Sequence, residues 1–542
     1  MQIKEQNISK IMFWLLVVSA VVRGALAALL EFGNDEVYYW TYALYPDWSH
    51  FDHPPMVGWV IQLFSLNLLF DSEFFIRLAS IVFMTADTYI IYRIAKGIKD
   101  AQTGLYAALF YTASIYAFVI TGVFIMPDTP LMLFWLLAFW MAVKYFSTLR
   151  VIARHEAIQK NHYLILFGLF AGLAMLSKYS GVFLWVGMGL YILIFNRKQL
   201  KNPYLYLSLL ISAVCCLPIL YWNLQNDFIS FSFHSERVGG GHINFGTFGA
   251  ELAGEFLYNN PVIFVLAIIA IVAAFKGKIN MEKSALRLVL CTALPLIFTF
   301  LLFSLTRPTL PHWNAPAYIL LILLISCSLS DKNLASEGRF KLPKSIVAAL
   351  SVMLVVVVFG SIEIQTGIIP LDRHTEPEKL GRDDFTLDMY GWKQLEEKFA
   401  ALREKKIAEG LMNEEDGIVA DEWFPLANLD YYVARPLGMK VMGIGWPHNL
   451  HKYLWINEKR GGFQKGENFW FLSDSRYFKR PEALYPGGFD SIEFIDTITI
   501  ERCGKPAKNF FVYACKGLIY MQPTVSELMA QREAAKQNPT KP

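Results

Sequence analysis

Two acidic residues and an Asp-His pair follow the first apolar run of the chain. Asp35 and Glu36 come first, and Asp52 and His53 lie further along the same polar segment. A carboxylate can act as a general base and an imidazole can carry a proton, so these residue types suit acid–base chemistry. Charged groups beside a membrane span are rare unless they have a task. We therefore favour function over the alternatives of a solvated loop carboxylate or a helix N-cap.

Further polar residues recur in the short connections between apolar runs. Asp128 and Lys178 suit a charged site, although the first would also cap a helix and the second would also snorkel to a membrane surface. An arginine guanidinium binds phosphate oxygens in pairs, with a lipid headgroup as the alternative partner. The candidates for substrate binding in these connections are Asp128, Lys178, Tyr179, Arg237, Arg307, His312 and Trp313.

Aromatic residues surround the acidic pairs. Their rings suit stacking against a sugar, and an interfacial aromatic belt is the simpler alternative. Tyr38 and Tyr39 are the candidates for substrate binding. The other members of the cluster are Trp40, Tyr42, Trp48 and Trp59.

Four histidines could join Asp52 in a metal site, but their spacing matches no recognised ligand pattern. They are His53, His234, His242 and His312. Loop histidines are the favoured interpretation. The sequence requires no cofactor, and a divalent cation is left open.

The composition is typical of a membrane protein. Of 542 residues, 55% are hydrophobic and 18% are charged, and the mean hydropathy is +0.36. A soluble protein has about 25% charged residues. Many apolar runs in the first two thirds approach the roughly 20 residues that span a bilayer core. The first run is too long for a signal-peptide core, so we expect a retained helix. A net charge of +3 says little about partners, and we expect no nucleic acid among them.

The apolar runs predict a polytopic α-helical membrane protein. Lysine and arginine gather in alternate connections, which the positive-inside rule places in the cytoplasm together with the N-terminus. An odd number of spans then puts the chain from about residue 365 outside. The predicted transmembrane helices, about 11 in number, are 11–30, 74–95, 104–124, 129–147, 162–177, 180–196, 204–222, 259–275, 285–305, 314–330 and 344–364.

This topology divides the chain into three parts. Residues 1–364 form a transmembrane catalytic domain, 365–525 a soluble extracytoplasmic α/β domain, and 526–542 a flexible tail. The first outer loop, 31–73, carries the acidic pairs, and the other candidates fall in connections on the same outer side. We therefore predict a polar cavity at the outer membrane boundary. Two apolar segments that are poor spans, 56–70 and 244–258, suit interfacial helices.

Alternating hydrophobicity predicts the elements of the soluble domain. An amphipathic helix is expected over 391–406. Strands are expected over 417–420, 440–443, 469–472, 492–500 and 509–514. Cys503 and Cys515 flank two of these strands, and a disulfide between them is plausible in an oxidising compartment.

The first outer loop resembles the signature of the family 39 glycosyltransferases, which include the protein O-mannosyltransferases and their bacterial relatives. The resemblance rests on residues 35–40 and 48–55. It extends in order to residues 127–130, 172–179, 223–231 with Arg237, and 312–318. It covers roughly residues 10–330 and is weak in the soluble domain.

The resemblance implies a GT-C fold and inverting transfer of a sugar from a polyprenyl-phosphate donor, undecaprenyl phosphate in a bacterium. It matches Asp35 to the catalytic carboxylate, Glu36 to its partner and Asp128 to a second acidic position. The segment 52–55 reads Asp-His-Pro-Pro where the more distant aminoarabinose–lipid A transferases have Glu-Lys-Pro-Pro. This departure argues against aminoarabinose as the sugar.

These inferences predict an integral glycosyltransferase of the bacterial inner membrane. In the expected mechanism Asp35 is the general base, and Lys178, Arg237, Arg307 and His53 stabilise the leaving lipid phosphate. The acceptor is a lipid, a glycan or a protein, and membrane lipids surround the enzyme. The alternative is a multi-span transporter or lipid flippase. That class typically places its charges at mid-membrane on broken helices and often repeats its halves, which this sequence does not.

Overall fold

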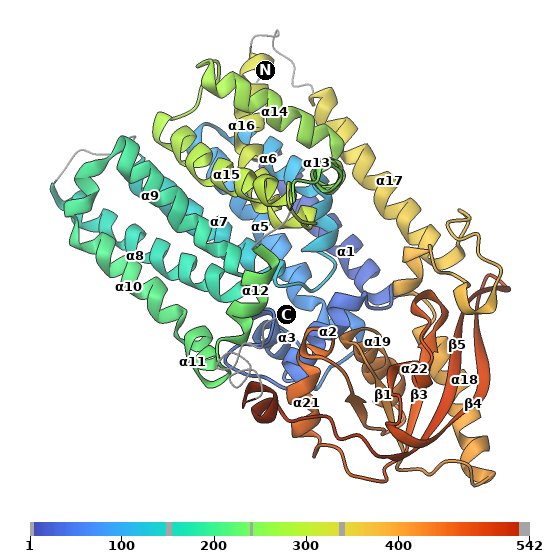
Figure 1. The fold of residues 1–542 in the computed structure, drawn as a ribbon. Coiled ribbons are helices and arrows are strands. Elements are labelled where there is room, and N and C mark those ends of the chain that lie inside the picture. The colour runs from blue at the N-terminus through green and yellow to red at the C-terminus, as the bar shows by residue number, and fades with distance from the viewer. Residues whose placement is uncertain (1–4, 148–153, 239–241, 335–341, 531–542) are drawn as a thin grey trace.

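The computed structural model describes residues 5–147, 154–238, 242–334 and 342–530. A bundle of helices forms the first part, and a domain with one sheet forms the second (Figure 1). The long helices of the bundle are α1 Glu5–Leu29, α5 Leu78–Ile98, α6 Ala101–Ala113, α7 Asp128–Phe146, α8 Arg154–Ser177, α9 Phe183–Phe195, α10 Pro203–Cys215, α14 Pro261–Phe275, α15 Lys283–Ser304, α16 Ala315–Leu334 and α17 Lys344–Thr366.

Shorter helices connect the long ones and carry most of the polar residues. On the site side they are α2 Asn34–Leu44, α3 Met56–Phe64, α4 Glu73–Ile76, α11 Leu217–Gln225, α12 Ile229–Val238 and α13 Phe245–Tyr258, with the single turns η2 Tyr179–Val182 and η4 Pro311–Trp313. These short elements lie between the long helices, and their polar side chains gather at one end of the bundle.

Five of the described helices are long and apolar enough to cross a membrane by length and composition, or up to seven if two bent pairs each count as one span. The predicted number of eleven therefore stays a prediction. The predicted span 204–222 is two helices, α10 and α11, bent by 42°. Pro218 lies just inside α11, where the lack of its N–H explains why the helix does not continue unbroken.

Both segments predicted as interfacial are helical. The helix in 56–70 ends at Phe64, earlier than predicted. Helix α13 turns by 104° into α14, as an interfacial helix beside a span would. The carboxylates of Glu251 and Glu255 on α13 are buried against η4 and α16: Thr309 donates to the first at 2.8 Å, and Tyr318 donates to the second at 2.6 Å.

The C-terminal sheet domain, which was predicted to be soluble and is called the soluble domain below, contains the predicted helix and all the predicted strands. Helix α18 is Trp392–Ala408, and the strands are β1 Gly417–Ala420, β2 Val441–Gly443, β3 Phe469–Asp474, β4 Phe489–Arg502 and β5 Lys505–Leu518. The sheet order is β2-β1-β3-β5-β4, with β1 parallel to β2 and β3, and β5 antiparallel to β3 and β4. Strands β4 and β5 form a hairpin and extend beyond the predicted limits.

The disulfide considered between Cys503 and Cys515 does not form, because both thiols are free. Cys503 is exposed in the turn of the β4–β5 hairpin. Cys515 is a buried residue of β5 and pairs across the hairpin with Ile492 of β4. Each residue of a strand advances about 3.3 Å, so the two cysteines are much further apart than the roughly 4–7 Å that a disulfide bridges.

The two parts of the molecule share one apolar core. Phe32 of the first outer loop packs against Tyr431, whose ring centroid lies 5.0 Å away, and its main-chain N–H donates to the Tyr432 hydroxyl at 2.6 Å. Helix α2 also contacts α19, which is Trp423–Asn428. Figure 1 shows α2 and α19 between the helical bundle and the sheet. The first outer loop is thus held between two domains.

Candidate active site

Asp35 lies in the first turn of α2, where a helix N-terminus favours negative charge. Its side chain is exposed. The pKa of Asp35 is nevertheless raised to about 6. Desolvation by the surrounding protein is the largest cause, Asp52 and Glu36 also raise the pKa, and Lys178 lowers it. Asp35 is therefore a carboxylate that a substrate can reach, with a pKa close to neutrality.

Glu36, the next residue, is fully buried and engaged on both oxygens. Arg77 donates from Nε to Oε1 at 2.7 Å and from Nη2 to Oε2 at 2.6 Å. The main-chain N–H groups of Ile125 and Gly33 donate to the same carboxylate at 3.0 Å each. These four hydrogen bonds use the accepting capacity of both carboxylate oxygens. Glu36 therefore has no oxygen available to a substrate and instead stabilises α2. Sequence reasoning did not single out Arg77, although a charged residue at the head of an apolar run was the available signal.

Asp52 is held by two tyrosines of α2. The hydroxyls of Tyr38 and Tyr42 donate to its Oδ1 at 2.8 and 2.5 Å. Burial alone would raise the pKa of Asp52, but the neighbouring imidazoles of His53 and His451, together with the two phenols, hold it below its ordinary value. Asp52 is therefore ionised at neutral pH, and the Tyr38 hydroxyl is engaged in a hydrogen bond to this carboxylate.

His53 lies next to Asp52, with Nε2 3.9 Å from Oδ2. Burial lowers the pKa of His53 to about 3, which leaves the ring neutral. Its ring centroid lies 5.6 Å from that of Tyr39 and 6.5 Å from that of His234. His234 in turn places Nε2 2.8 Å from the Asp52 carbonyl oxygen. Because the ring is neutral, His53 could assist a leaving phosphate as a hydrogen-bond donor and not as a cation.

Asp128 and Lys178 form a buried ion pair. Lys178 Nζ donates to Asp128 Oδ1 at 2.9 Å and to Oδ2 at 2.7 Å. The Tyr116 hydroxyl donates to Oδ1 at 2.9 Å. Asp128 begins α7 without a capping hydrogen bond, and Lys178 is buried. The ion pair therefore argues against both simpler interpretations, in which Asp128 only caps a helix and Lys178 snorkels to a membrane surface.

His312 of η4 joins this group. Burial lowers the pKa of His312 to about 4, with Lys178 lowering it and Asp128 raising it, so both charges lie close to the ring. Its ring centroid is 6.3 Å from that of Tyr258, the last residue of α13. Asp35, His53 and His312 are thus all close to the Asp128–Lys178 pair, so the structure brings together residues of several connections that were predicted to lie on one side of the membrane.

The remaining candidates lie at the edge of this group. The Tyr179 ring packs 5.0 Å from that of His234. Trp313 turns towards α15 and packs 5.5 Å from Phe300. Arg307 is half-buried in the turn before η4. Arg237 belongs to α12, and its side chain lies outside the described ones.

Two adjacent residues of the soluble domain also reach the site, and sequence reasoning missed them. His451 places Nδ1 3.9 Å from Asp52 Oδ2. The buried Lys452 donates from Nζ to the carbonyl oxygens of Thr41 and Tyr45 at 3.0 and 2.6 Å. They belong to a stretch with only weak family resemblance, so no local signal pointed to them.

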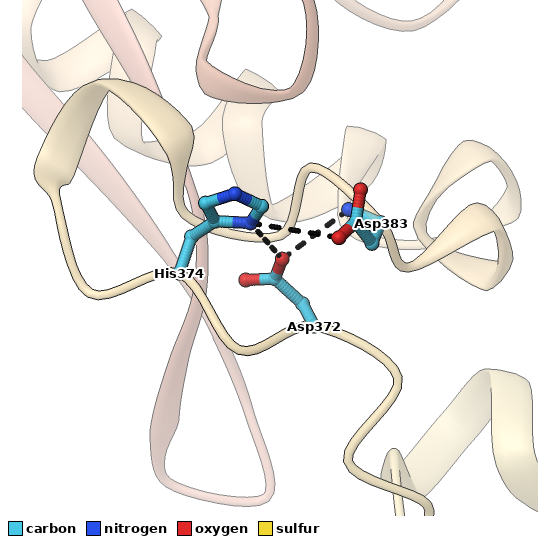
Figure 2. A group of neighbouring side chains, drawn as sticks. All are labelled: Asp372, His374 and Asp383. Carbon is cyan, nitrogen blue, oxygen red and sulfur yellow. Dashed lines mark hydrogen bonds and ion pairs between the residues drawn. The ribbon is translucent and has the colours of Figure 1, made fainter.

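Among the described residues, one group of histidine and acidic side chains has ligand atoms within 4.8 Å of one another: Asp372, His374 and Asp383. Figure 2 shows it on a loop of the soluble domain. Hydrogen bonds within the loop account for it, because His374 Nδ1 lies 2.8 Å from Asp372 Oδ1 and Gly381 N donates to Oδ2 at 2.8 Å. Within the same described part of the chain, the four histidines considered as a metal site form no such group.

Comparison with known proteins agrees with this arrangement. The family model described as dolichyl-phosphate-mannose-protein mannosyltransferase matches residues 52–222. The lipid A galacturonosyltransferase RgtD of Rhizobium johnstonii is 21% identical over 296 residues, which are 53% of this chain and 59% of that protein. The chain thus aligns with less than two thirds of that relative.

Solved structures share the whole architecture. ArnT from Cupriavidus metallidurans bound to undecaprenyl phosphate superposes with a TM-score of 0.59 at 14% identity, over 93% of this chain and 97% of that one. The chain shares the fold of this protein, as the predicted GT-C fold class requires. The apo form of ArnT superposes with a TM-score of 0.58 at 13% identity, over 93% and 98%. These likenesses confirm the predicted fold class and, together with the long apolar helices, support a multi-pass membrane protein.

Proposed function

We propose that this GT-C protein transfers a sugar from a polyprenyl-phosphate donor to an acceptor on the outer face of the bacterial inner membrane, with inversion at the anomeric carbon. One observation carries the proposal: Asp35 is accessible, has a pKa raised to about 6 and lies near the buried Asp128–Lys178 pair. A base and a cation close together are what displacement of a phosphate by a hydroxyl requires.

Asp35 acts as the general base. The acceptor hydroxyl is a poor nucleophile until its proton is removed, and a carboxylate with a pKa near 6 is mostly ionised at pH 7 yet still basic enough to take the proton. The hydroxyl oxygen attacks the anomeric carbon, the bond to the lipid phosphate breaks, and the proton passes to Asp35. If the acceptor is itself a phosphate, no base is needed and Asp35 orients the substrate.

Lys178 is the group best placed to receive the leaving phosphate. Its ammonium has three protons, of which two point to Asp128, so one remains for a phosphate oxygen. His312 adds a neutral hydrogen bond donor beside it. Arg237 and Arg307 remain candidate phosphate ligands in the adjoining connections, while Tyr39 and Tyr179 offer ring faces towards the sugar.

The membrane setting supports a lipid-linked donor. The Asp128–Lys178 pair lies at the head of α7, one of the helices suited to span a membrane. A polyprenyl tail would stay in the bilayer while its phosphate reached this pair. ArnT, which shares the fold, was solved with undecaprenyl phosphate bound. The cytoplasmic N-terminus and extracytoplasmic soluble domain follow from the distribution of basic residues.

The competing function is a transporter or lipid flippase. Arg23 on α1 and Asp87 on α5 favour it, since both are fully buried within spanning helices, where charge usually marks a pathway. The polar residues around Asp35 favour the transferase, because they gather at one end of the bundle, whereas a transporter typically places its charges at mid-membrane on broken helices.

One experiment separates the two functions. The purified protein is incubated in detergent with radiolabelled undecaprenyl-phosphate sugars and a membrane extract that supplies acceptors. The proposal expects label to move to an acceptor with release of free undecaprenyl phosphate in equal amount. Folded protein that transfers no label from any donor, but moves labelled lipid across reconstituted vesicles, would establish the transporter instead.

A further inference from the structure

A loop of the soluble domain docks on the helix that carries Asp35. Its anchor is Lys452, whose ammonium donates to the carbonyl oxygens of Thr41 and Tyr45 at the end of α2 and lies 4.6 Å from the Tyr42 ring. Helix ends expose carbonyl oxygens that need donors, and a cation there also suits the helix dipole. The soluble domain therefore helps to fix α2 from outside.

His451, the residue before this anchor, is held in a conformation that few side chains adopt. Its φ of 49° and ψ of −126° match the first central position of a type II′ turn, which glycine favours. Non-glycine residues in such regions persist where the surrounding structure forces them, often at ligand sites. Here the strained turn directs a buried imidazole to Asp52.

The oxygen of Asp52 that faces this imidazole retains its capacity to accept hydrogen bonds. Both phenol hydrogen bonds end on Oδ1. Oδ2 has His53 Nε2 and His451 Nδ1 at 3.9 Å each, beyond hydrogen-bond distance. An ionised carboxylate accepts up to four hydrogen bonds, so Oδ2 can receive a hydroxyl of a ligand.

An aromatic wall continues from His451. The Trp423 ring lies nearly parallel to the imidazole, with centroids 5.6 Å apart and planes 17° apart, and its centroid is 5.0 Å from that of Tyr38. Trp423 is half-exposed. A partly exposed aromatic face beside a carboxylate is a combination that suits a sugar ring, which offers C–H groups on its face and hydroxyls at its edge.

We propose that Asp52, His451 and Trp423 form the acceptor subsite, and that the acceptor group bound there is a carbohydrate. One of its hydroxyls donates to Asp52 Oδ2, and its ring packs on Trp423. This assignment rests on the proposed transferase function. The membrane side of the site holds the Asp128–Lys178 pair for the donor phosphate, which leaves the side formed by the soluble domain for the acceptor.

The test is saturation kinetics with Trp423→Ala and His451→Gly. Glycine suits the positive φ, so the second variant removes the ring without adding backbone strain. The acceptor is the membrane-extract fraction that becomes labelled in the transfer assay, titrated at saturating undecaprenyl-phosphate sugar. We expect the acceptor KM to rise about tenfold or more, with the donor KM within about twofold. Trp423→Phe should restore most of the acceptor affinity.

Matched controls keep the result interpretable. His162→Ala removes an exposed histidine far along α8 from Lys178 and should leave both KM values unchanged. Size-exclusion profiles and thermal midpoints show which variants fold, and the Trp423 pair decides if His451→Gly does not. An unchanged acceptor KM, or a rise in the donor KM instead, would overturn the subsite. Absence of transfer by the wild type would overturn the proposed function itself.

Discussion

Asp35 and Glu36 are neighbours in the chain but perform different tasks, because successive residues of a helix point in different directions and these two side chains meet different surroundings. Glu36 faces inward and is fixed by Arg77, whereas Asp35 is accessible and, among the described side chains, is bonded to no such cation. The pattern of two adjacent acids predicted the place of the chemistry. The pattern alone does not distinguish the two acids, because the pairing of Glu36 depends on Arg77, which directly precedes α5, and the assignment of the base to Asp35 rested on the family resemblance.

The pKa of Asp35 predicts the pH dependence of transfer. Since the base must be ionised, kcat/KM should fall about tenfold for each pH unit below about 6, where Asp35 gains its proton. His53 and His312 have pKa values of about 3 and about 4, so both rings stay neutral between pH 5 and 7 and add no further change to kcat/KM in that range. A pH profile with no decrease between pH 7 and 5 would contradict this assignment.

The buried Glu36–Arg77 pair predicts a large effect on stability. Glu36→Gln removes the negative charge and leaves the guanidinium of Arg77 buried without a counter-ion, which costs roughly 3–5 kcal/mol. The thermal midpoint in detergent should fall by many degrees. The control is Glu409→Gln, which breaks the pair of the exposed Glu409 with Lys406 and should leave the thermal midpoint nearly unchanged. Equal midpoints for the two variants would refute the structural role of Glu36.

Helix α13 shows how an element positions the site without supplying a catalytic group. Its Gly254 lies against Pro311 of η4, and a Cβ there would come 2.0 Å from Pro311 Cγ. The buried Glu255 holds the same region through Tyr318. The position of His312 on η4 therefore depends on close packing against α13.

This packing predicts opposite outcomes for two glycines of one helix. Gly254→Ala should push η4 and His312 outward, cost about 1–3 kcal/mol and lower kcat several-fold. Gly249→Ala meets no atom within 4 Å and should be neutral or stabilise by up to about 1 kcal/mol. Thermal midpoints and transfer rates of both variants check this. If Gly254→Ala behaved like Gly249→Ala, α13 would not control the turn.

At the scale of the whole molecule, the sequence predicted the two-part architecture, every strand and the gathering of outer connections. These follow from hydrophobic periodicity and the placement of basic residues, which are local signals. The role of the soluble domain at the site was not predictable, because the contacts of His451 and Lys452 with α2 join residues about 400 positions apart. The sequence also left the Cys503–Cys515 disulfide open, since the distance between the two residues depends on the register of the hairpin.

The docking of the soluble domain predicts that Lys452 stabilises the entire fold. Lys452→Met leaves the carbonyl oxygens of Thr41 and Tyr45 without their donor, so α2 should loosen and limited proteolysis of the soluble domain should accelerate. Lys440→Met, at an exposed position of the same domain, is the control. Identical proteolysis rates for the two variants would mean that the domains are not coupled through this lysine.

The central claim is that Asp35 is the base of a glycosyl transfer. The most direct measurement is single-turnover transfer from a bound radiolabelled undecaprenyl-phosphate sugar by the wild type, Asp35→Asn and the control Asp227→Asn, an exposed acid in the turn after α11. We predict that Asp35→Asn slows transfer by about 10²–10⁴-fold while donor affinity and thermal midpoint stay unchanged, and that Asp227→Asn has no effect. Transfer by Asp35→Asn at the wild-type rate would contradict the account.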